Sequence, residues 1–465
     1  MALRDYPKRA AELLERRPEV RESVMRAALH FDRNRARAYA EVDTEAWRGY
    51  ARRVKDRLLT GLDRYLEAVE ARLTQNGVRV HWAEGPEDVH RVLGEIVRAA
   101  GVRRAVKAKS MLSEELGVNA FLEAQGVEVF ETDLGEFIIQ LAGEPPSHIV
   151  GPAIHKSLAE IQRLFAEHLG TPPDASPEAL AAAARAFLRE KFLTAELGIS
   201  GANFLVAETG TIVLVENEGN IRLSTSLPRV HVALVGIEKL LPRWEDLAVF
   251  LQLLARAATG QPIGTFVSLI QGPRRPGETE GPEEVHVVLV DNGRSAALAD
   301  LEAGEVLRCI RCGACLNACP VYRQTGGHPF GFVYSGPIGE VLAPALLGPR
   351  EAYPLYHAST LCGACAEVCP VEIPIPKLLL TWRRRAAEEG IRLPLERELV
   401  RGYAEAMVRP RAYRLASKAM RAFPGALRSE RLPLVRAWTR LRAGLEPSPR
   451  PFHELWEEIK DEREG

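Results

Sequence analysis

Cysteine is missing from the first 308 residues of this chain, and no stretch reaches the ~20 apolar residues that a membrane-spanning helix needs. Excess charge is missing too: the formal net charge is −1, which implies no general attraction to nucleic acid or anionic lipid. The first residues, MALRDYPKRAAELLERR, are highly charged, whereas a secretory signal would be apolar there. We therefore expect a soluble cytoplasmic protein without a transmembrane segment, peripheral to a membrane only through partners.

What is present is ordinary globular composition on a long chain. The 465 residues are 46% hydrophobic and 26% charged, which excludes a disordered, collagenous or disulfide-framework protein. A chain of this length is expected to form about three domains. The seven cysteines fall into two groups near the C-terminal third. Because a disulfide framework would scatter an even number of cysteines, this grouping favours metal binding in a reducing compartment.

The pattern along the chain predicts four regions. Residues 1–75 repeat apolar positions every three or four residues, which indicates helices. Residues 76–302 alternate short apolar runs with amphipathic stretches, which is typical of an α/β domain with a largely parallel sheet. The cysteine segment occupies residues 303–376, and residues 377–465 are expected to form a basic, helical C-terminal region.

Within the α/β region, the expected strands are VRVHWA, RAVKA, VEVFET, TIVLV, VHVALVG, TFVSLI and VHVVLV. Helices are expected at residues 85–101 and 111–126, and an Ala-rich helix is expected to begin near Pro177. The Gly/Pro-rich residues 271–284 are expected to form a surface loop. The alternation of strands and helices predicts an α/β fold for this region.

The first cysteine segment has the spacing of bacterial ferredoxins. It reads Cys-x2-Cys-x2-Cys-x3-Cys-Pro from Cys309 to Pro320, and in two-cluster ferredoxins the fourth cysteine ligates the other 4Fe–4S cluster. The second segment, Cys362 to Pro370, repeats the end of this pattern. Reciprocal sharing predicts a cluster 1 held by Cys309, Cys312, Cys315 and Cys369, and a cluster 2 held by Cys319, Cys362 and Cys365.

Cluster 2 is then one cysteine ligand short. The position expected for this ligand, three residues before Cys362, is occupied by Ser359. A serine can ligate iron weakly, so Ser359 is a candidate eighth ligand. The nearby His357, a ligand from solvent or a partner, and a three-iron cluster are the alternatives, and the sequence does not choose among them.

A zinc site is the competing interpretation of these cysteines. Zinc sites use four ligands, usually paired Cys-x2-Cys units or mixtures of Cys and His. Neither seven cysteines nor two Cys-Pro endings suit that pattern, so iron–sulfur binding is favoured. Two clusters that share cysteine segments would lie close together, which favours electron transfer over a purely structural role.

Together with the cysteines, two long segments resemble the lactate utilization protein B family. They are residues 108–156, beginning AKSMLSEELGVNAF, and residues 202–242, beginning ANFLVAETGTIVLVENEGN. The resemblance covers nearly the whole chain. It implies α/β plus α architecture: a LUD domain of the sugar-phosphate isomerase and CoA-transferase (NagB/RpiA/CoA-transferase-like) type, followed by a helical ferredoxin-like domain with two clusters. A serine at the position of Ser359 is also a trait of this family.

The function implied by the resemblance is electron transfer during the oxidation of L-lactate to pyruvate. Companion subunits would include a dehydrogenase that supplies electrons, and the acceptor would be a quinone or a soluble carrier. The sequence has no GxGxxG fingerprint that opens a helix after a strand, and no P-loop. Lactate oxidation itself is therefore expected on another chain, and no catalytic residue is assigned here.

An enzyme of the acyl-transfer or isomerase type, with clusters kept for structure or sensing, is the alternative function. Glu208 and residues 216–220 (ENEGN) flank an expected strand, and a glutamate is the nucleophile of CoA-transferases. The competing interpretation of ENEGN, which contains Glu216, Asn217, Glu218, Gly219 and Asn220, is a polar turn between strands. Lys107, Lys109 and Ser110 follow another strand, where they would bind a carboxylate or phosphate or form a solvated strand end.

Two further polar features have competing interpretations. Ser147, His148, His155 and Lys156 lie in a loop that leads into a helix, where a histidine could act as a base near neutral pH. Without a hydride-accepting cofactor, such a base would have little to do. The basic C-terminal helices are expected to dock onto partner subunits or the α/β domain, and nucleic-acid binding is not expected.

Overall fold

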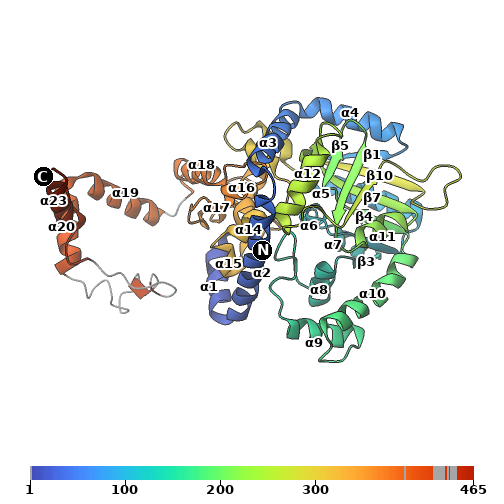
Figure 1. The fold of residues 1–465 in the computed structure, drawn as a ribbon, viewed down its shortest axis with the longest axis horizontal. Helices are drawn as coiled ribbons and strands as arrows, with labels where there is room; N and C mark the ends of the chain where they lie inside the picture. The colour runs from blue at the N-terminus through green and yellow to red at the C-terminus, as the bar shows by residue number, and fades with distance from the viewer. Residues whose placement is uncertain (1–2, 392–393, 423–434, 437–438, 440–447, 465) are drawn as a thin grey trace. The chain divides into compact units, whose positions relative to one another are not determined.

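The computed structural model describes residues 3–391, 394–422, 435–436, 439 and 448–464. The chain divides into two compact units, residues 1–385 and 386–465. The first unit contains both β-sheets and all seven cysteines, and the described part of the second unit is helical (Figure 1). Among the described residues, no helix combines the length and the apolar character needed to cross a membrane.

Helices open the chain, as the spacing of apolar residues predicts. They are the 3-10 turn η1 (Leu3–Asp5) and the helices α1 (Tyr6–Arg16), α2 (Pro18–Ala40), α3 (Thr44–Thr60) and α4 (Leu62–Gln75). Asp43 starts α3 because its carboxylate accepts a hydrogen bond from the amide of Ala46 at 3.1 Å. Helix α2 packs against α14 (Ala314–Ala318) and α15 (Tyr322–Thr325) of the cysteine segment. The N-terminal helices therefore cover the cysteine segment.

A six-stranded sheet, in which every neighbouring pair is parallel, forms the centre of the first unit. In spatial order its strands are β1 (Arg79–Ala83), β10 (Glu284–Val290), β7 (Val230–Gly236), β4 (Leu197–Ser200), β2 (Arg104–Lys107) and β3 (Glu128–Glu131). Parallel strands covered on both faces are expected to be continuously apolar. All residues of β7 are buried, which agrees with its central place.

A second, smaller sheet has the order β8-β5-β6-β9. Its strands are β8 (Leu240–Leu241), β5 (Phe204–Val206), β6 (Thr211–Glu216) and β9 (Phe266–Ile270). The runs TIVLV and TFVSLI are strands, as predicted, but they pair antiparallel in this second sheet and lie outside the parallel one. Strands β4, β5 and β8 escape prediction because two to four residues are too few to show a period.

The helices of the α/β region lie between its strands, as their amphipathic pattern predicts. They are α5 (Pro86–Ala100), α6 (Met111–Glu115), α7 (Val118–Ala124), α8 (Leu134–Ala142), α9 (Leu158–Leu169), α10 (Pro177–Thr194), α11 (Asn220–Ser226) and α12 (Leu247–Ala258), with the 3-10 turn η2 (Ile237–Lys239). Residues 111–126 form two helices where one was predicted. Gly117 has a φ of 64°, a left-handed conformation that a continuous right-handed helix cannot contain.

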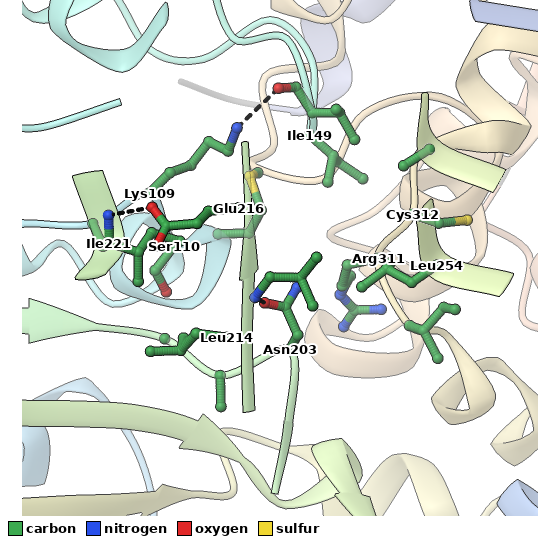
Figure 2. A pocket seen from close by; sticks show the side chains of 18 of the residues that line it. Lys109, Ser110, Ile149, Asn203, Leu214, Glu216, Ile221, Leu254, Arg311 and Cys312 are labelled. Atoms are coloured by element: carbon green, nitrogen blue, oxygen red, sulfur yellow. Dashed lines mark hydrogen bonds between the residues drawn. The ribbon is translucent and has the colours of Figure 1, made fainter. Parts of the chain in front are cut away.

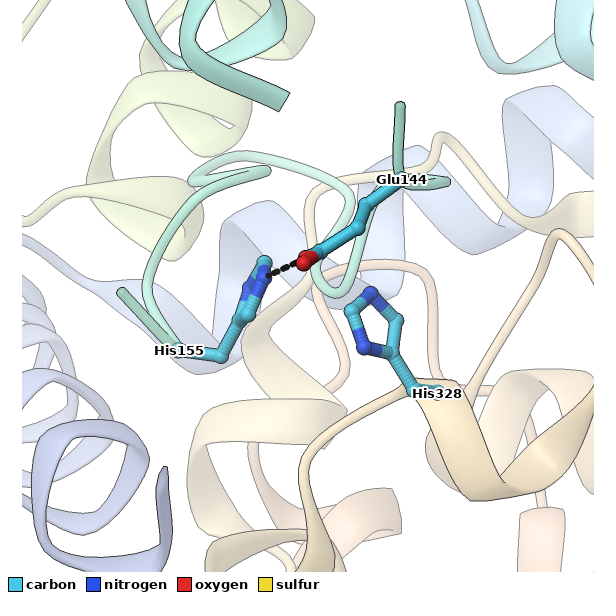
Figure 3. A group of neighbouring side chains, drawn as sticks. All are labelled: Glu144, His155 and His328. Carbon is cyan, nitrogen blue, oxygen red and sulfur yellow. Dashed lines mark hydrogen bonds and ion pairs between the residues drawn. The ribbon is translucent and has the colours of Figure 1, made fainter. Parts of the chain in front are cut away.

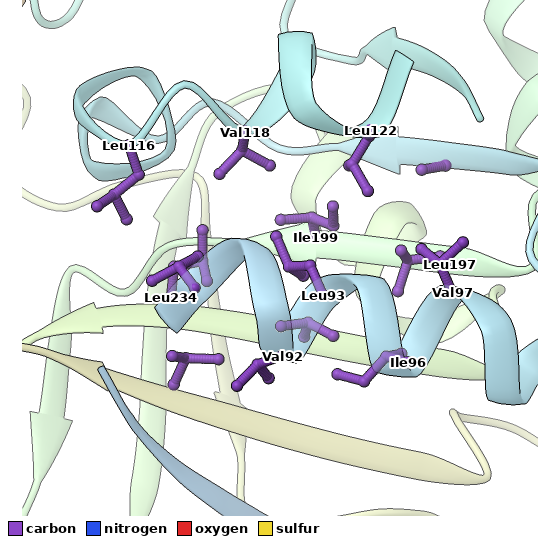
Figure 4. Packing of buried hydrophobic residues seen from close by; sticks show 14 of the residues in the cluster. Val92, Leu93, Ile96, Val97, Leu116, Val118, Leu122, Leu197, Ile199 and Leu234 are labelled. Carbon is purple, nitrogen blue, oxygen red and sulfur yellow. The ribbon is translucent and has the colours of Figure 1, made fainter. Parts of the chain in front are cut away.

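Separate apolar clusters cover the two faces of the parallel sheet. Alternate residues of β10 belong to different clusters: Val287 packs with α3, α4 and the second sheet, whereas Val288 packs with α5, α6 and α7. Figure 4 shows Leu93 of α5 packed toward Ile199 of β4 in the second of these clusters. This alternation gives the sheet one apolar cluster on each face.

Short helices and turns hold the cysteine segment. They are α13 (Arg294–Ala299), η3 (Gly304–Arg308), η4 (His328–Phe330), α16 (Gly336–Leu347), η5 (Leu355–His357), α17 (Ala364–Glu367) and α18 (Ile375–Glu388), in addition to α14 and α15. Helix α16 packs against α13, α14, η3 and η5. It is therefore the central support of this segment.

The second unit contains α19 (Pro394–Val408), α20 (Pro410–Ala422) and α23 (Phe452–Glu464). Residues 392–393, 423–434, 437–438, 440–447 and 465 of the predicted basic region lie outside the described residues. The described helices leave large apolar side chains exposed, among them Leu399, Tyr403 and Leu415.

We expect Leu93→Ala to lower the free energy of unfolding by about 2–5 kcal/mol, because Leu93 is fully buried and its truncation leaves a cavity. Leu193→Ala is the matched control: Leu193 of α10 is 64% exposed, and its loss should change the same quantity by less than about 0.5 kcal/mol. Urea denaturation measures both variants. Equal losses would contradict this description of the core.

Candidate metal centre and adjoining cavity

The two cysteine segments share one local backbone geometry. Positive φ angles flank one cysteine in each: Arg311 (61°) and Gly313 (77°) around Cys312, and Leu361 (57°) and Gly363 (91°) around Cys362. A short helix, α14 or α17, follows each loop. Left-handed residues in such loops turn successive backbone amides toward one side, which favours an anionic group there. By this correspondence, Ser359 occupies in the second segment the place of Cys309 in the first.

Backbone amides donate hydrogen bonds to cysteine sulfurs in both segments. The amide of Arg311 lies 3.4 Å from Sγ of Cys309, and the amide of Ile373 lies 3.3 Å from Sγ of Cys369. The amide of Tyr322 lies 3.5 Å from Sγ of Cys319. Amide donors of this kind stabilise negative charge on sulfur and tune cluster potentials.

The cysteines fall into two neighbouring sets. One small cavity is lined by Cys309, Cys312, Cys315 and Cys369. Burial raises the pKa of Cys365 to about 12, and Cys319 and Cys362 are among the charges that raise it further, so these three thiols form the other set. Burial likewise raises the pKa of Cys315, and charge on Cys312 and on Cys365 raises it further, which indicates that the two sets are neighbours.

Positive charge surrounds the first set. Burial lowers the pKa of Lys55 to about 7 and that of Lys239 to about 8, and negative charge on Glu238 and Cys309 opposes both shifts. Arg311 is buried beside Cys309, and its Nε and Nη1 have no hydrogen-bond partner among the described residues. Buried cations and unused donors around a thiol fit an anionic iron–sulfur cluster better than a neutral site.

A fourth cation ties the second cysteine segment to the N-terminal helices. Arg48 of α3 donates from Nε to the carbonyl oxygen of Cys369 at 2.9 Å and from Nη2 to that of Ala366 at 3.2 Å. Arg48, Lys55 and Lys239 could not be predicted as part of the site, because they lie far from the cysteines in sequence. Arg311 could have been predicted from the sequence as part of the site, because it lies inside the first Cys-x2-Cys loop.

The surface end of the site is formed by Cys362, which is exposed, whereas the other cysteines are buried or partly buried. Ser359 lies beside it, and its Oγ accepts a hydrogen bond from the amide of Leu361 at 3.2 Å. The ring of His357 packs against that of Tyr356, with 5.1 Å between the ring centroids. The contacts of Ser359 and His357 are thus those of a packed turn.

A cavity of about 370 Å³ adjoins the first set of thiols. Figure 2 shows Arg311 and Cys312 on one side of it and Lys109 and Glu216 on the other. Its size falls in the range of small-molecule sites, which are typically about 300–1,000 Å³. The LUD-like α/β region and the cysteine segment therefore share one cavity wall.

The three carboxylates considered as nucleophiles, Glu208, Glu216 and Glu218, do not all line one cavity. Glu216 and Glu218 line the cavity, but Glu208 does not and instead accepts a hydrogen bond from the amide of Trp244 at 2.8 Å. Both oxygens of Glu216 accept amides at the start of α11, from Ile221 at 2.7 Å and Arg222 at 2.9 Å. ENEGN is therefore a turn from a strand to a helix, not between two strands as expected.

The lysines at the end of β2 do not form a solvated strand end. Lys107 is fully buried and forms ion pairs with Glu114 at 2.9 Å and Glu131 at 2.8 Å, which keep its ammonium charged away from water. Lys109 lines the cavity and pairs with Asp133 at 3.0 Å. Ser110 starts α6, with its hydroxyl accepting a hydrogen bond from the amide of Ser113. Only Lys109 and Ser110 reach the cavity.

The loop with Ser147 and His148 docks on the cysteine segment. His148 Nδ1 accepts two backbone amides, so Nε2 carries the proton and donates to Asn317 Oδ1 of α14 at 3.1 Å. The carbonyl oxygen of Ser147 accepts the Tyr322 hydroxyl at 2.7 Å. These residues join the α/β region to the cysteine segment, and their hydrogen bonds leave His148 without the role of a base.

Glu144, His155 and His328 form a second polar group at this junction (Figure 3). Glu144 Oε2 accepts from His155 Nε2 at 2.7 Å, and its other oxygen pairs with Lys156 at 2.5 Å. His328 Nε2 lies 2.8 Å from the carbonyl oxygen of Pro145. Both Glu144 oxygens therefore already have partners in the protein. Hydrogen bonding explains why these three side chains lie together, without a bound metal ion.

We expect stability to fall as pH is lowered from 6.5 toward 4. Burial lowers the pKa of His148 from 6.5 to about 4, so below pH 6.5 the unfolded chain binds a proton that the folded chain does not. His148→Gln should reduce this slope, and His155 and His231, whose pKa values burial also lowers to about 4, should preserve the rest. Urea denaturation at several pH values gives the slope. An unchanged slope in the variant would refute the assignment.

Three family models match successive parts of the chain. They are the LUD domain at residues 66–290, the 4Fe-4S dicluster domain at residues 305–373, and the C-terminal domain of lactate utilisation protein B at residues 387–461. A crystal structure of a DUF162 family protein from Deinococcus radiodurans covers 50% of this chain and 98% of its own at 17% identity, with a TM-score of 0.28, too low to support an argument.

Curated relatives match over most of their length. "Uncharacterized electron transport protein YkgF" of Escherichia coli is 44% identical over 89% of this chain and 87% of its own. Lactate utilization protein B of Bacillus licheniformis is 42% identical over 90% of this chain and 89% of its own. That of Macrococcus caseolyticus is 44% identical over 81% and 79%. The chain therefore belongs to the lactate utilization protein B family and is an iron–sulfur protein of lactate utilization.

Proposed function

We propose that this chain is the iron–sulfur electron-transfer subunit in the oxidation of L-lactate to pyruvate. The observation that carries the proposal is that the cysteine segment includes both an exposed thiol and a thiol on the cavity wall. Cys362 is exposed, and Cys312 lines the cavity wall. The pKa of Cys315 is raised by burial and then by charge on thiols of both sets. Redox centres placed along such a path would connect a partner at the surface with the interior of the LUD domain.

The proposal includes two 4Fe–4S clusters with seven cysteine ligands. Cluster 1 takes Cys309, Cys312, Cys315 and Cys369, and cluster 2 takes Cys319, Cys362 and Cys365. The shared cavity of the first four thiols supports this division. The mutual effects of the other three on their pKa values support it as well.

Oxidation of the alcohol carbon of lactate to the ketone of pyruvate releases two electrons and two protons. Each 4Fe–4S cluster, when bound, supplies one-electron redox chemistry, so two clusters match one turnover. The side chains of this chain set the charge around the proposed clusters. Arg311, Lys55 and Lys239 place positive charge at Cys309, which favours an added electron on the cluster 1 side.

The partners follow from what this chain does not supply. A companion dehydrogenase would abstract hydride from lactate, and a quinone or a soluble carrier would be the final acceptor. Cys362 marks the face where the companion or the acceptor would approach. The exposed apolar side chains of α19 and α20, such as Tyr403 and Leu415, support docking of companion subunits on the second unit.

The alternative, a LUD-domain acyl transferase or isomerase with structural or sensing clusters, has weaker support. A nucleophilic glutamate needs free carboxylate oxygens, and both oxygens of Glu216 accept backbone amides. Glu218 accepts the amide of Leu134 at 3.2 Å. We propose the sugar-phosphate isomerase and CoA-transferase type only for the fold of this domain, supported by its parallel sheet covered on both faces.

We expect L-lactate to reduce the bound clusters only when the companion subunits are present. The anaerobically purified chain should keep its visible absorption when L-lactate is added alone, because we propose that hydride is abstracted on a companion subunit. Adding co-purified companions should bleach that absorption, and D-lactate is the control for substrate recognition. Bleaching of this chain alone by L-lactate would overturn the assignment of the oxidising site to a partner.

Reciprocal sharing of the cysteines makes a separate prediction for EPR of the reduced protein. Cys369→Ser in the second segment should alter the same cluster signal as Cys312→Ser in the first, because both thiols line one cavity. Cys319→Ser should instead alter the signal that responds to Cys362→Ser. The four variants serve as controls for one another. Signals that divide by sequence segment would refute the shared ligand sets.

A further inference from the structure

Three neighbouring strands of the parallel sheet end at the cavity beside Cys312. Residues 108–112 after β2 and residues 201–203 after β4 line it, and the turn after β7 adds Glu238 and Lys239. From β2 the chain passes to β3 on one side, whereas β4 and β7 lie on the other, so the connections diverge between β2 and β4. Small molecules bind to open parallel sheets at such a point, outside the carboxyl ends of the strands. The cavity therefore has the position of a ligand site.

Two guanidinium groups at the inner end of the cavity are already neutralised. This end is the part lined by Glu238, Lys239, Arg294 and Arg311. Arg294 pairs with Glu238 at 2.7 Å and with Glu115 at 2.9 Å, and Nη2 of Arg311 lies 3.4 Å from the other oxygen of Glu238. Two carboxylates thus balance two of the three cations, and one positive charge remains.

The ammonium of Lys239 is the remaining charge. Lys239 lines the cavity and is only partly exposed. None of the described residues forms a hydrogen bond or an ion pair with it. The guanidinium of Arg311 lies on the ring of Tyr334, with 4.4 Å from its Cζ to the ring centroid, and so remains at the same end. A cation held away from bulk water is stabilised by an anion, so the inner end favours an anionic group.

The carboxylates at the outer end already have partners. Both oxygens of Glu216 accept backbone amides of α11, and Asp133 pairs with Lys109 at 3.0 Å. Glu218 also lines the cavity, and its side chain is exposed, which places the mouth at this end. A ligand would therefore enter past Glu218 with its anionic group directed inward.

Apolar side chains form the wall between the two ends. Leu214, Leu234 and Leu254 are buried and line the cavity. Figure 2 shows Leu214 and Leu254 with Asn203, whose Oδ1 accepts the amide of Val215 at 2.8 Å. A volume of 370 Å³ accommodates about a dozen water-sized groups at ~30 Å³ each. The space therefore exceeds that needed by a single inorganic ion and fits an anion with a carbon body.

We propose that this cavity binds a small organic oxyanion, with its carboxylate or phosphate group at Lys239 and its carbon body against the leucines. Both groups present the charged oxygens that an ammonium binds. The inference goes beyond the proposed function, because the site is built from the strand ends of the α/β region and needs no electron transfer. It gives the LUD domain a ligand of its own beside the cysteine segment.

Calorimetric titration of the anaerobically purified full-length chain tests the site. The probes are phenylacetate, benzyl phosphate and phenylacetamide, the last of which is the neutral counterpart of phenylacetate. We expect at least one anion to bind about 10-fold or more tightly than phenylacetamide, because a hydrogen bond to a charged group contributes that much. The tighter anion identifies the acidic group as carboxylate or phosphate. Equal binding of all three probes, or binding of none, would overturn the proposal.

Lys239→Gln removes the charge that the proposal assigns to the ligand. It should weaken binding of the preferred anion about 10-fold or more and leave binding of phenylacetamide unchanged. Lys239→Arg should keep the preference for the anion. Lys377→Gln is the matched control: Lys377 is 67% exposed and does not line the cavity, so its loss should change neither affinity. An anion affinity in Lys239→Gln equal to that of the wild type would contradict the site.

Ala202→Phe keeps the test decisive if Lys239→Gln folds poorly. Ala202 follows β4 and lines the cavity, so a phenyl ring there should fill the space and abolish binding of both phenylacetamide and the anion without removing a charge. Urea denaturation shows whether each variant is folded. A folded Ala202→Phe that binds the anion as the wild type does would place the anion elsewhere and overturn the proposal.

The potential of cluster 1 provides a second readout, which rests on the proposed function as the calorimetry does not. An anion beside Cys312 should make cluster 1 harder to reduce, because it offsets the positive charge of the inner end. A redox titration followed by EPR should show this shift with the preferred anion and not with phenylacetamide. An unmoved potential despite binding would overturn the inner placement. A chain that binds the anion but holds no iron would overturn the proposed function alone.

Discussion

Negative charge on sulfur, brought into the protein interior, is the constraint on which the first unit depends. Thiolates can be buried only where donors and cations compensate them. Backbone amides of Arg311, Tyr322 and Ile373 approach three of the sulfurs, and Lys55 and Lys239 place positive charge near Cys309. The amides belong to the cysteine segment itself, whereas the two lysines come from distant parts of the sequence, so only the folded chain brings all of these groups to the thiols.

The same constraint explains why the N-terminal helices and the α/β region surround the cysteine segment. Arg48 of α3 binds carbonyl oxygens next to Cys369, and His148 of the α/β region binds Asn317 between Cys315 and Cys319. Each contact gives a polar group of the cysteine segment a hydrogen-bond partner. The LUD domain is thereby part of the wall around the cysteine segment, and its cavity lies beside Cys312.

The two ends of the proposed electron path differ in charge. The cluster 1 side has Arg311, Lys55 and Lys239 nearby, whereas the cluster 2 side includes the exposed Cys362. Positive charge stabilises a reduced cluster and negative charge destabilises it, so the protein itself would favour electrons near the cavity. Charge on thiols of both sets raises the pKa of Cys315 beyond the effect of burial, which indicates that the two surroundings are neighbours.

Sequence by itself determined the features that depend on local spacing. The Cys-x2-Cys loops, the helices with apolar periods and the long strands such as VHVALVG could all be predicted, because a turn, a helix face or a buried strand is fixed by neighbouring residues. Strands as short as Leu240–Leu241 and the break at Gly117 could not, since two residues show no period and one glycine is compatible with several conformations. Only the tertiary structure decided what lies beside the sulfurs. Lys55, Arg48 and Lys239 have no mark in the sequence, because their positions near the cysteine segment result from packing between segments far apart in the chain.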